Sequence, residues 1–590
     1  MSGAEATTLW ARAFADELAR AGVRQIVVAP GSRSVPLVMA FAEDGRFSVR
    51  VHLDERSAAF FALGVGKATG MPAALVTTSG TAGANAFPAV IEASLSEAPL
   101  LVLTADRPHR LRDADANQAI DQVRLFGPFA RAFFDVAPPT RHGPALRHLR
   151  ALAGRAVLAA REAPAGPVHL NFPFDKPLEP AGMSREGVAF ATQHPLAAGG
   201  RPEGSGFVAA RTTHRSASAE ELARLSTLVA GARCGVVVAG PNPEPRRVGE
   251  AAVRLAAATG FPVLADPLSG ARFRPPGGAQ VVDAYDLFLG DAYVRERLVP
   301  DLVLRVGASP TSGALQGWME HHSSVRQVVI DGGGRWKDHA AIATDYVHAD
   351  AADTLRILTG NASRNTDAAW TWAWGAAAAV ARASVEAQQG GEPYEGEILA
   401  AAVAAIPAGS SLFVSSSMPV RDLDAFAAPR PETLAVLGNR GASGIDGIVS
   451  TAFGIAAASM GATVCVLGDV ALFHDLNGLL WSREPDAPVV FVLVDNDGGG
   501  IFHLLPTREL EPWFTPLFAA PHGLDFHHAA RLHGIPLEDV APEDVGDALG
   551  RALAKGGTRI LRVRTDRAAV QRRRREVADF VAGSVRAALG

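Results

Sequence analysis

Short, continuously apolar runs alternate along the chain with longer segments rich in Ala and Leu. Apolar runs of strand length separated by helical segments are typical of parallel sheets that are buried on both faces. In the first part of the chain such runs begin at Gln25, Ala73, Pro99 and Pro167. The pattern therefore predicts a first α/β domain over residues 1–185.

The alternation stops over residues 185–218, which are rich in Gly, Ser, Pro, Arg and Thr and are expected to form an exposed connection. A second α/β domain is predicted over residues 205–355. Its apolar runs begin at Cys234, Pro262 and Asp301. The helical, Trp-containing segment 367–390 is expected to be the next linker.

A third block over residues 390–590 repeats the pattern. Its apolar runs begin at Ser411, Thr463, Pro488 and Arg559. The fold class predicted is therefore α/β, with three doubly wound parallel-sheet domains. No short repeat or low-complexity tract favours another architecture.

Composition agrees with a large globular protein, since the 590 residues are 48% hydrophobic and 20% charged. The net charge of −5 gives no general attraction to nucleic acid. A basic run from Arg572 to Arg575 is interpreted as a solvated helix face. Cys234 and Cys465 lie in apolar contexts, as buried thiols of a reducing compartment do. With no apolar leader and no long apolar span, a cytoplasmic protein without an integral membrane segment is expected.

Two polar positions follow neighbouring apolar runs in the third block. Asp469 comes after the run that ends at Gly468, and Asn496 after the next run. The carboxyl ends of parallel strands meet at one sheet edge, where α/β proteins bind ligands. Asp469, Asn496 and the backbone carbonyl near Gly498 would offer the oxygens that Mg²⁺ prefers. The alternative is that Asp469 caps a helix and residues 495–498 form an ordinary turn.

A carboxylate in the first block, Glu55, follows an apolar alternation and precedes a helix of small residues. It is expected to project from the start of that helix. Taken alone, it is also explained by a favourable interaction with the helix dipole.

Five segments carry a resemblance to one enzyme family: APGSRSVPL (29–37), HLDERSAAFFALGVGKATG (52–70), TTSGTAGANAFPAVIEAS (77–94), TADRPHRLRDADANQAI (104–120) and GNRGASGIDG (438–447). Together they closely resemble 2-succinyl-5-enolpyruvyl-6-hydroxy-3-cyclohexene-1-carboxylate synthase, a thiamine-diphosphate enzyme of menaquinone biosynthesis. The resemblance covers all three predicted domains and is densest in the first and third.

The resemblance implies a division of labour among the domains. The first would bind the pyrimidine of thiamine diphosphate, the second would be Rossmann-like, and the third would bind the diphosphate and Mg²⁺, or Mn²⁺ in its place. Glu55 would bind the aminopyrimidine and promote loss of the thiazolium C2 proton. Ile445, otherwise a core residue in a Gly-rich loop, would hold the cofactor bent. The sites would lie between subunits of a homo-oligomer, either a dimer or a tetramer.

The resemblance also implies the substrates, 2-oxoglutarate and isochorismate. The enzyme would decarboxylate the first and add the remaining fragment to the second. Both are polyanions, which arginine side chains bind through paired hydrogen bonds. An isolated arginine is more often a surface or ion-pair residue. The matching positions are Ser32, Arg33, Arg107, Asn117, Gln118, Ser417, Arg421 and Arg440, with Phe502 lining the substrate side; Ser417 and Gly468 would also contact the cofactor.

The chain departs from the family pattern at several positions. Val470 and Ala471 replace residues familiar after the Gly-Asp pair, and Ala471 removes one expected contact to the diphosphate. His109-Arg110 and Asp115 differ near the substrate loop, and Gly313 stands where a lysine is common. The loss of that lysine at Gly313 would remove a substrate contact in the second domain.

Three other readings stay open at the level of sequence. Another thiamine-diphosphate carboligase, similar to acetolactate synthase, would share the cofactor residues but not the arginines. A nicotinamide-binding protein is disfavoured because the glycines at 64, 66 and 70 have the wrong spacing for a dinucleotide motif. A non-catalytic relative is disfavoured because Glu55, Asp469 and Asn496 are all present.

Overall fold

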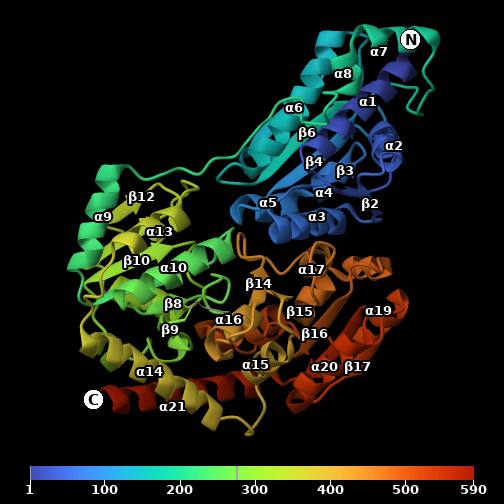
Figure 1. Cartoon of the computed structure of the whole chain (residues 1–590). Coiled ribbons are helices and arrows are strands. Elements are labelled where there is room, and N and C mark those ends of the chain that lie inside the picture. The colour runs from blue at the N-terminus through green and yellow to red at the C-terminus, as the bar shows by residue number, and fades with distance from the viewer. Residues whose placement is uncertain (1, 274–276) are drawn as a thin grey trace. The chain divides into compact units, whose positions relative to one another are not determined.

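The computed structural model describes residues 2–273 and 277–590, and within these residues three six-stranded sheets are present (Figure 1). Each strand pairs in parallel with its neighbours. The three-domain α/β prediction is therefore confirmed as a fold class. The proposed domain limits stay predictions.

The first sheet has the strand order β2-β1-β3-β4-β6-β5. Its strands are β1 (Gln25–Val28), β2 (Ser48–Val51), β3 (Ala73–Thr77), β4 (Leu100–Asp106), β5 (Ala132–Asp135) and β6 (Pro167–Pro173). The helices of this part of the chain are α1 (Gly3–Arg20), α2 (Val35–Glu43), α3 (Glu55–Thr69), α4 (Thr81–Asn85), α5 (Phe87–Leu95), α6 (Gly143–Arg161), α7 (Arg185–Gln193) and α8 (Pro195–Gly199), with 3-10 turns η1 (Ser32–Ser34), η2 (His109–Leu111) and η3 (Gly127–Phe129).

The second sheet has the order β12-β11-β10-β7-β8-β9. Its strands are β7 (Gly235–Ala239), β8 (Val263–Ala265), β9 (Val281–Val282), β10 (Leu302–Val306), β11 (Arg326–Ile330) and β12 (Asp345–Val347). The helices of this part are α9 (Ala219–Gly231), α10 (Pro245–Thr259), α11 (Ala292–Arg297), α12 (Gly313–His321), α13 (Ala351–Asn361) and α14 (Ala368–Ala387), with the 3-10 turn η4 (Tyr285–Leu287).

The third sheet has the order β14-β13-β15-β16-β18-β17. Its strands are β13 (Ser410–Val414), β14 (Leu434–Gly438), β15 (Thr463–Gly468), β16 (Val489–Asp495), β17 (Leu537–Asp539) and β18 (Arg559–Arg564). The helices are α15 (Glu395–Ala405), α16 (Met418–Phe426), α17 (Ile448–Ala456), α18 (Asp469–His474), α19 (Phe526–His533), α20 (Val545–Lys555) and α21 (Arg567–Leu589), with shorter turns η5 (Leu476–Arg483), η6 (Gly500–Leu504), η7 (Pro506–Glu509), η8 (Thr515–Ala519) and η9 (Pro542–Asp544).

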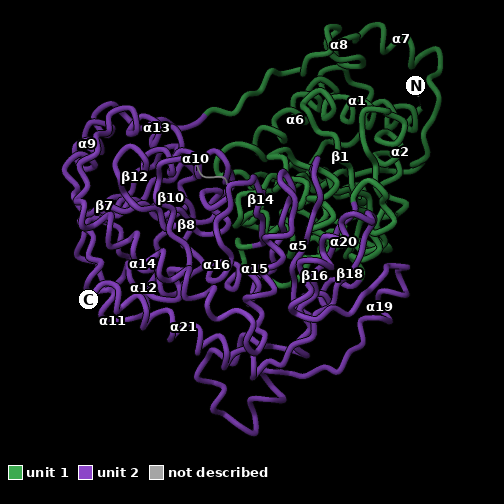
Figure 2. The backbone as a smooth tube through the Cα atoms, turned by 60° about the horizontal axis from the view of Figure 1, so that its bottom comes forward, with its two compact units in different colours: residues 1–213, 440–458, 477–487 green, residues 214–439, 459–476, 488–590 purple. Residues whose placement is uncertain are grey.

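The chain divides into two compact units whose segments interleave along the sequence (Figure 2). Unit 1 contains the first sheet and comprises residues 1–213, 440–458 and 477–487. Unit 2 contains the second and third sheets and comprises residues 214–439, 459–476 and 488–590. Helix α17 therefore belongs to unit 1, although the strands before and after it belong to unit 2.

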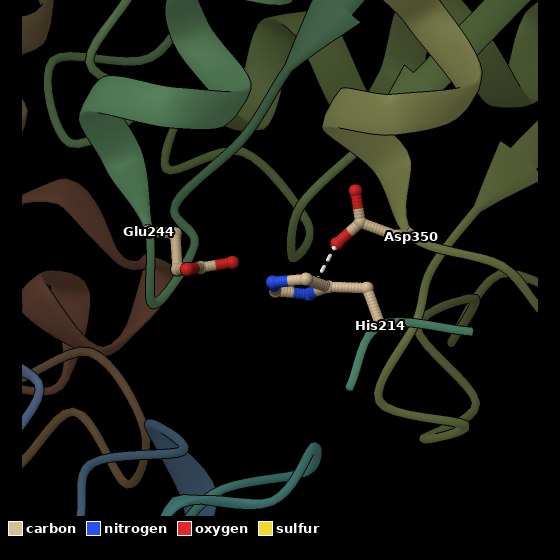
Figure 3. A group of neighbouring side chains, drawn as sticks. All are labelled: His214, Glu244 and Asp350. Atoms are coloured by element: carbon tan, nitrogen blue, oxygen red, sulfur yellow. Dashed lines mark ion pairs between the residues drawn. The ribbon is translucent and has the colours of Figure 1, made fainter. Parts of the chain in front are cut away.

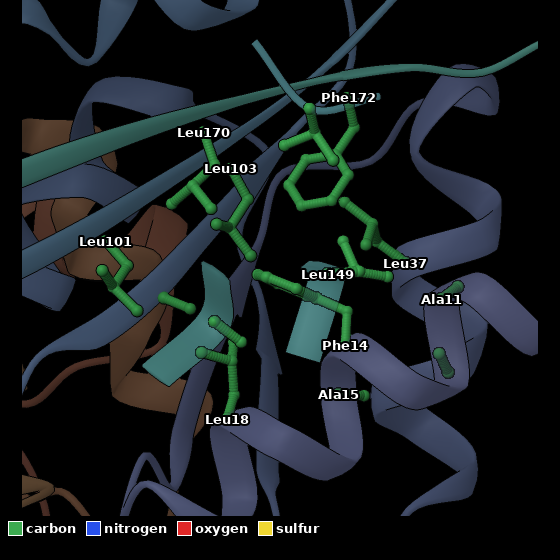
Figure 4. Close-up of a cluster of buried hydrophobic side chains, with 14 of the residues drawn as sticks. Ala11, Phe14, Ala15, Leu18, Leu37, Leu101, Leu103, Leu149, Leu170 and Phe172 are labelled. Carbon is green, nitrogen blue, oxygen red and sulfur yellow. The ribbon is translucent and has the colours of Figure 1, made fainter. Parts of the chain in front are cut away.

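The core of unit 1 forms where α1 packs on the first sheet (Figure 4). Phe14 and Leu18 point from α1 toward Leu103 of β4 and Phe172 of β6, and all four are fully or almost fully buried. The rings of Phe14 and Phe172 meet edge to face with centroids 4.9 Å apart. Strands β4 and β6 are buried along their whole length, including the polar residues Thr104, His169 and Asn171 within them.

Two segments predicted to be linkers differ from that expectation: the first contains helices, and the second, a helix as predicted, packs into a core. The start of the predicted connection 185–218 forms α7 and α8. The predicted linker 367–390 is α14, which packs against α21 and buries Trp370 and Trp374 in a core of unit 2. Large aromatic side chains spaced one turn apart gave α14 an apolar face that needed a partner.

The basic run near the C-terminus is only partly solvated, so that interpretation was wrong in part. Arg572 and Arg575 are exposed on α21, but Arg574 is buried and forms an ion pair with Asp422 of α16. Cys465 is buried, as expected, whereas Cys234 is partly exposed. None of the helices within residues 2–273 and 277–590 is long and apolar enough to cross a membrane.

Helices α3 and α17 pack in close contact within unit 1 because both present glycine at the crossing. A Cβ atom at Gly454 would overlap the carbonyl oxygen of Phe61, and one at Gly64 would overlap the carbonyl oxygen of Thr451. We predict that Gly454→Ala lowers the melting temperature, since overpacking costs about 1–3 kcal/mol. Gly583→Ala in α21 is the matched control, because nothing lies near its added methyl group. Equal melting temperatures for both variants would contradict this packing argument.

Candidate active site

The residues proposed from the sequence fall in both units, and each unit is described by itself. Unit 1 holds Ser32, Arg33, Glu55, Arg107, Asn117, Gln118, Arg440 and Ile445. Unit 2 holds Ser417, Arg421, Gly468, Asp469, Asn496, Gly498 and Phe502.

Glu55 is the first residue of α3 and is half-buried. Asp54 caps this helix, because its side chain accepts hydrogen bonds from the backbone N–H groups of Arg56 and Ser57. The Nδ2 of Asn85 donates to Oε2 of Glu55 at 3.3 Å. The predicted projection of Glu55 from the start of a helix is thus what the backbone produces.

Three predicted substrate residues meet around Ser79 at the end of β3. The guanidinium of Arg107 donates to the Ser79 hydroxyl at 2.9 Å and to the carbonyl of Asn117 at 2.6 Å. The Ser79 hydroxyl donates to the Gln118 carbonyl at 2.9 Å, and Gln118 Nε2 donates back to the Ser79 carbonyl at 3.0 Å. These bonds hold the 117–118 turn against the carboxyl end of the sheet, with Arg107 only 8% exposed.

Arg33 adds a second buried guanidinium to this end of the first sheet. It lies in η1 after β1, donates from Nη1 to the Phe174 carbonyl at 2.8 Å, and keeps a buried Nε without a hydrogen-bond partner among the described residues. Burial and the positive charge of Arg107 lower the pKa of Arg33. Ser32, beside it, is exposed. Positive charge with an unused donor is suited to an anionic group.

A buried carboxylate that the sequence analysis missed fixes the loop that carries Arg440 and Ile445. The carboxylate of Glu92, on α5, accepts from the N–H of Gly441 at 3.0 Å and from the N–H of Ala442 at 2.7 Å. Lys67 of α3 donates to the same carboxylate at 3.1 Å and balances its charge. Glu92 lies within the quoted segment 77–94, but its spacing gave no sign of this role.

In unit 2 the predicted strand-end pair is brought together. Strands β15 and β16 pair in parallel, with Gly468 opposite Val494. Asp469 follows β15 and Asn496 follows β16, so both emerge at the carboxyl edge of adjacent strands, as predicted. Asp469 is 2% exposed.

The oxygens at this edge are arranged for a cation. Asp469 Oδ2 accepts from the Gly498 N–H at 2.9 Å, and Oδ1 accepts from the Val470 N–H at 2.7 Å. Asn496 Oδ1 is buried and has no hydrogen-bond partner among the described residues. Gly498 has φ +135°, and a Cβ atom there would overlap the carbonyl oxygen of Ala519. A buried carboxylate and an unused amide oxygen at the ends of adjacent strands are ligands of the kind that a hard divalent cation prefers.

Two further groups lie at this edge. Asp495 ends β16 directly before Asn496, whereas His522 had no signal in the sequence pattern. Asp495 and His522 place ligand atoms within 4.8 Å of each other and of an Asp469 oxygen. His522 Nε2 is 3.1 Å from Asp469 Oδ2. Burial and the charge of Asp469 raise the pKa of Asp495. His522 comes from a loop remote in sequence, so only the folded chain identifies it.

Helix α16 carries Ser417 at its N-cap and Arg421 in its second turn. Ser417 has φ 72°, a conformation that non-glycine residues adopt at a strain cost of about 1–3 kcal/mol. Arg421 Nη1 donates to the Ser417 carbonyl at 2.6 Å. Such strain is often found where a side chain must be presented to a ligand.

Two buried ion pairs hold the rest of α16. Asp422 pairs with Arg574 of α21, and Asp424 accepts from Arg272 Nη2 at 2.7 Å and from the Tyr285 hydroxyl at 2.9 Å. Burial raises the pKa of Asp422 to about 6 and that of Asp424 to about 8. The arginine partners oppose this rise by favouring the charged carboxylates.

Phe502 lies in η6, shortly after the glycines that follow Asn496. Its ring meets that of Phe518 edge to face, with centroids 6.0 Å apart. The side chain is half-buried, so part of it stays available for contact with a ligand.

A second group of possible metal ligands, His214, Glu244 and Asp350, lies in unit 2 near the second sheet (Figure 3). His214 and Glu244 are exposed. Asp350 pairs with His214 at 3.0 Å and with Arg247 at 2.7 Å, and Arg247 also pairs with Glu244. The arginine already balances these carboxylates, so we assign no ligand to this group.

Three family models match: the N-terminal thiamine pyrophosphate binding domain of thiamine pyrophosphate enzymes over residues 10–125, their middle domain over 209–414, and their C-terminal thiamine pyrophosphate binding domain over 425–563. The fold and these matches define the class as thiamine pyrophosphate enzymes.

Curated relatives narrow the class to one family. A 2-succinyl-5-enolpyruvyl-6-hydroxy-3-cyclohexene-1-carboxylate synthase of Halobacterium salinarum is 46% identical over 99% of this chain and 100% of its own length. The synthase of Chloroflexus aurantiacus is 42% identical over 95% of this chain and 94% of its own length. The synthase of Geobacillus kaustophilus is 41% identical over 96% of each chain. The chain belongs to the 2-succinyl-5-enolpyruvyl-6-hydroxy-3-cyclohexene-1-carboxylate synthase family.

A solved structure shares the fold at much lower identity. Benzoylformate decarboxylase from Polynucleobacter necessarius superposes with a TM-score of 0.71, covering 94% of this chain and 98% of its own, at 15% identity. This likeness supports the three-sheet architecture.

The loop that carries Arg440 and Ile445 should depend on Glu92. Glu92→Ala removes the acceptor of two backbone N–H groups and breaks an ion pair whose side chains are 9% and 4% exposed. Breaking a buried pair costs about 3–5 kcal/mol. We predict a lower melting temperature and faster hydrogen–deuterium exchange over residues 440–447, measured by mass spectrometry. Glu43→Ala, at an exposed ion pair with Arg12, is the control. Unchanged exchange over 440–447 would refute this role.

Proposed function

We propose that the chain is a thiamine-diphosphate-dependent transferase that decarboxylates 2-oxoglutarate and adds the remaining fragment to isochorismate. The product would be 2-succinyl-5-enolpyruvyl-6-hydroxy-3-cyclohexene-1-carboxylate, an intermediate of menaquinone biosynthesis. The observation that carries the proposal is the identity of 41–46% to synthases of that name over nearly the whole chain. It favours this reading over an acetolactate synthase-like carboligase.

Thiamine diphosphate, when bound, would supply a nucleophilic carbon for the chemistry of 2-oxo acids. Glu55 would hydrogen-bond the aminopyrimidine and share a proton with it. Ile445 would support the cofactor, and Ser417 and Gly468 would contact it. Residues 1–185 form the pyrimidine-binding domain, 205–355 the central domain, and 390–590 the diphosphate-binding domain.

Asp469, Asn496 and the carbonyl of Gly498 would hold Mg²⁺, or Mn²⁺. The support is the buried Oδ1 of Asn496, which has no partner among the described residues, and the buried Asp469 at the end of the adjacent strand. Because the Gly498 carbonyl accepts one hydrogen bond, from the Gly500 N–H at 3.0 Å, it keeps a lone pair for the cation.

The two substrates are recognised through their carboxylates. Arg33 and Arg107 supply positive charge at the end of the first sheet, with Ser32, Asn117 and Gln118 around them. Arg421 and Arg440 bind further carboxylates, and Phe502 lines the apolar side. A homo-oligomer, dimer or tetramer, completes each site from two subunits, as the family resemblance implies.

The direct test follows isochorismate absorbance when the purified protein is mixed with 2-oxoglutarate, thiamine diphosphate and Mg²⁺, with each component omitted in turn. Loss of absorbance that requires every component supports the proposal. Consumption of pyruvate without isochorismate would favour the acetolactate synthase-like alternative. If isochorismate absorbance does not fall and pyruvate is not consumed, the proposed substrates are wrong.

Glu55→Gln should lower turnover by about 10²–10⁴-fold, the usual contribution of a positioned proton-transfer group, because the amide cannot share the proton in the same way. The melting temperature should stay close to that of the wild type, since Glu55 is half-buried and Asp54 still caps α3. Exchange of the C2 hydrogen of bound thiamine diphosphate, followed by NMR, should slow in parallel. Near-normal exchange and turnover would remove Glu55 from this role.

Arg421→Ala should raise KM for 2-oxoglutarate or isochorismate at least tenfold, because a hydrogen bond to a charged group contributes about 1.5–3 kcal/mol. Arg551→Ala, which removes an exposed arginine paired with Glu538, is the matched control and should change neither KM. Steady-state kinetics with each substrate varied measures both. If the two variants behave alike, Arg421 does not bind substrate.

A further inference from the structure

We infer that Glu395 is a positioning residue that determines which atom of the Asn496 amide faces the metal site; this inference rests on the proposed function. Glu395 was not among the residues indicated by the sequence. It is the first residue of α15 and is 3% exposed. Its carboxylate lies behind the metal-binding edge of the third sheet, in contact with Asn496.

The Glu395 carboxylate is held between two loops. Its Oε1 accepts from Asn496 Nδ2 at 2.8 Å and from the Thr565 hydroxyl at 3.1 Å. Asn496 follows β16 and Thr565 follows β18, which are neighbours in the sheet. A buried carboxylate with donors from both loops is fixed in position.

An amide offers a donor on one side and an acceptor on the other, whereas a carboxylate only accepts. The Asn496 NH₂ group must therefore face Glu395, and Oδ1 must face the opposite way. That oxygen is the buried atom without a partner among the described residues. If the amide were reversed, it would present N–H groups to the cation, which binds oxygen.

The backbone at this position is fixed independently of Glu395. Arg567 Nη1 donates to the Asn496 carbonyl at 2.8 Å and also to the Asp497 carbonyl. Arg567 thus holds the backbone of Asn496 and Asp497. Glu395 then restricts the rotation of the Asn496 side-chain amide. Partners that orient a metal ligand typically contribute about 10- to 100-fold in metal affinity.

The test compares Glu395→Leu, which removes the acceptor, with Glu395→Gln, whose carbonyl oxygen can replace Oε1. Mn²⁺ binding is measured by electron paramagnetic resonance with saturating thiamine diphosphate, at the same pH for every variant. We expect Glu395→Leu to weaken Mn²⁺ binding about 10- to 100-fold and Glu395→Gln to bind far more tightly than Glu395→Leu. Thr565→Val removes the second donor to Oε1 but keeps the bond to Asn496, so we expect a smaller loss of affinity than in Glu395→Leu.

A double-mutant cycle separates orientation from general disturbance. In an Asn496→Ala background, Glu395→Leu should have no further effect on Mn²⁺ affinity, because its action passes through the amide. An equal loss in both backgrounds, or wild-type affinity in Glu395→Leu, would overturn the inference. If Glu395→Leu does not fold, as judged by circular dichroism, Glu395→Met replaces it in the same cycle. Absence of Mn²⁺ uptake by the wild-type protein would instead overturn the proposed metal site.

Discussion

Burial of parallel strands on both faces is the constraint on which the rest of this structure depends. Strands β4, β6, β15 and β16 are buried almost throughout, so polar side chains within them, such as His169 and Asn171, must be hydrogen-bonded in the core. Polar groups that are to meet a ligand therefore lie at the strand ends. All strands of a parallel sheet point the same way, and their carboxyl ends therefore collect the polar residues at one edge. Ser79 and Arg107 in unit 1, and Asp469 and Asn496 in unit 2, stand at such edges.

Three buried carboxylates that hold segments carrying proposed site residues are each paired with a basic side chain. Glu92 is balanced by Lys67, Asp422 by Arg574 and Asp424 by Arg272. In each pair the Coulomb attraction is largely offset by the free energy needed to desolvate two ions. Each pair therefore contributes little more to stability than apolar side chains of similar size would. What each pair provides is a fixed orientation: for the loop at Gly441 in the first case, and for α16 in the other two.

The sequence predicted those parts of the fold and site that local patterns encode. Long apolar runs identified the central strands. The polar residues that follow two of these runs closely included Asp469 and Asn496. Short edge strands such as β9 and β12 lacked such runs, and α14 was taken for a linker because its composition was read without its partner α21. Motif resemblance supplied Glu55 and the arginines.

What the sequence could not supply were residues whose role arises from contact across long separations. Glu395 lies 101 positions from Asn496, and Glu92 lies 349 positions from Gly441. Neither residue has a spacing that distinguishes it from other helix-borne glutamates. His522, on a loop of irregular structure, reaches Asp469 only in the folded chain.

The interleaving of the two units has a consequence for how the protein is made. Unit 1 takes α17 and residues 477–487 from far along the chain, and α17 packs on α3 through Gly64 and Gly454. During synthesis, the apolar face of α3 therefore emerges from the ribosome long before the helix that covers it. Domains that end early in the sequence fold as they emerge, whereas this one must wait for most of the chain. The packing of unit 1 is thus completed only once residues 440–458 and 477–487 have been synthesised.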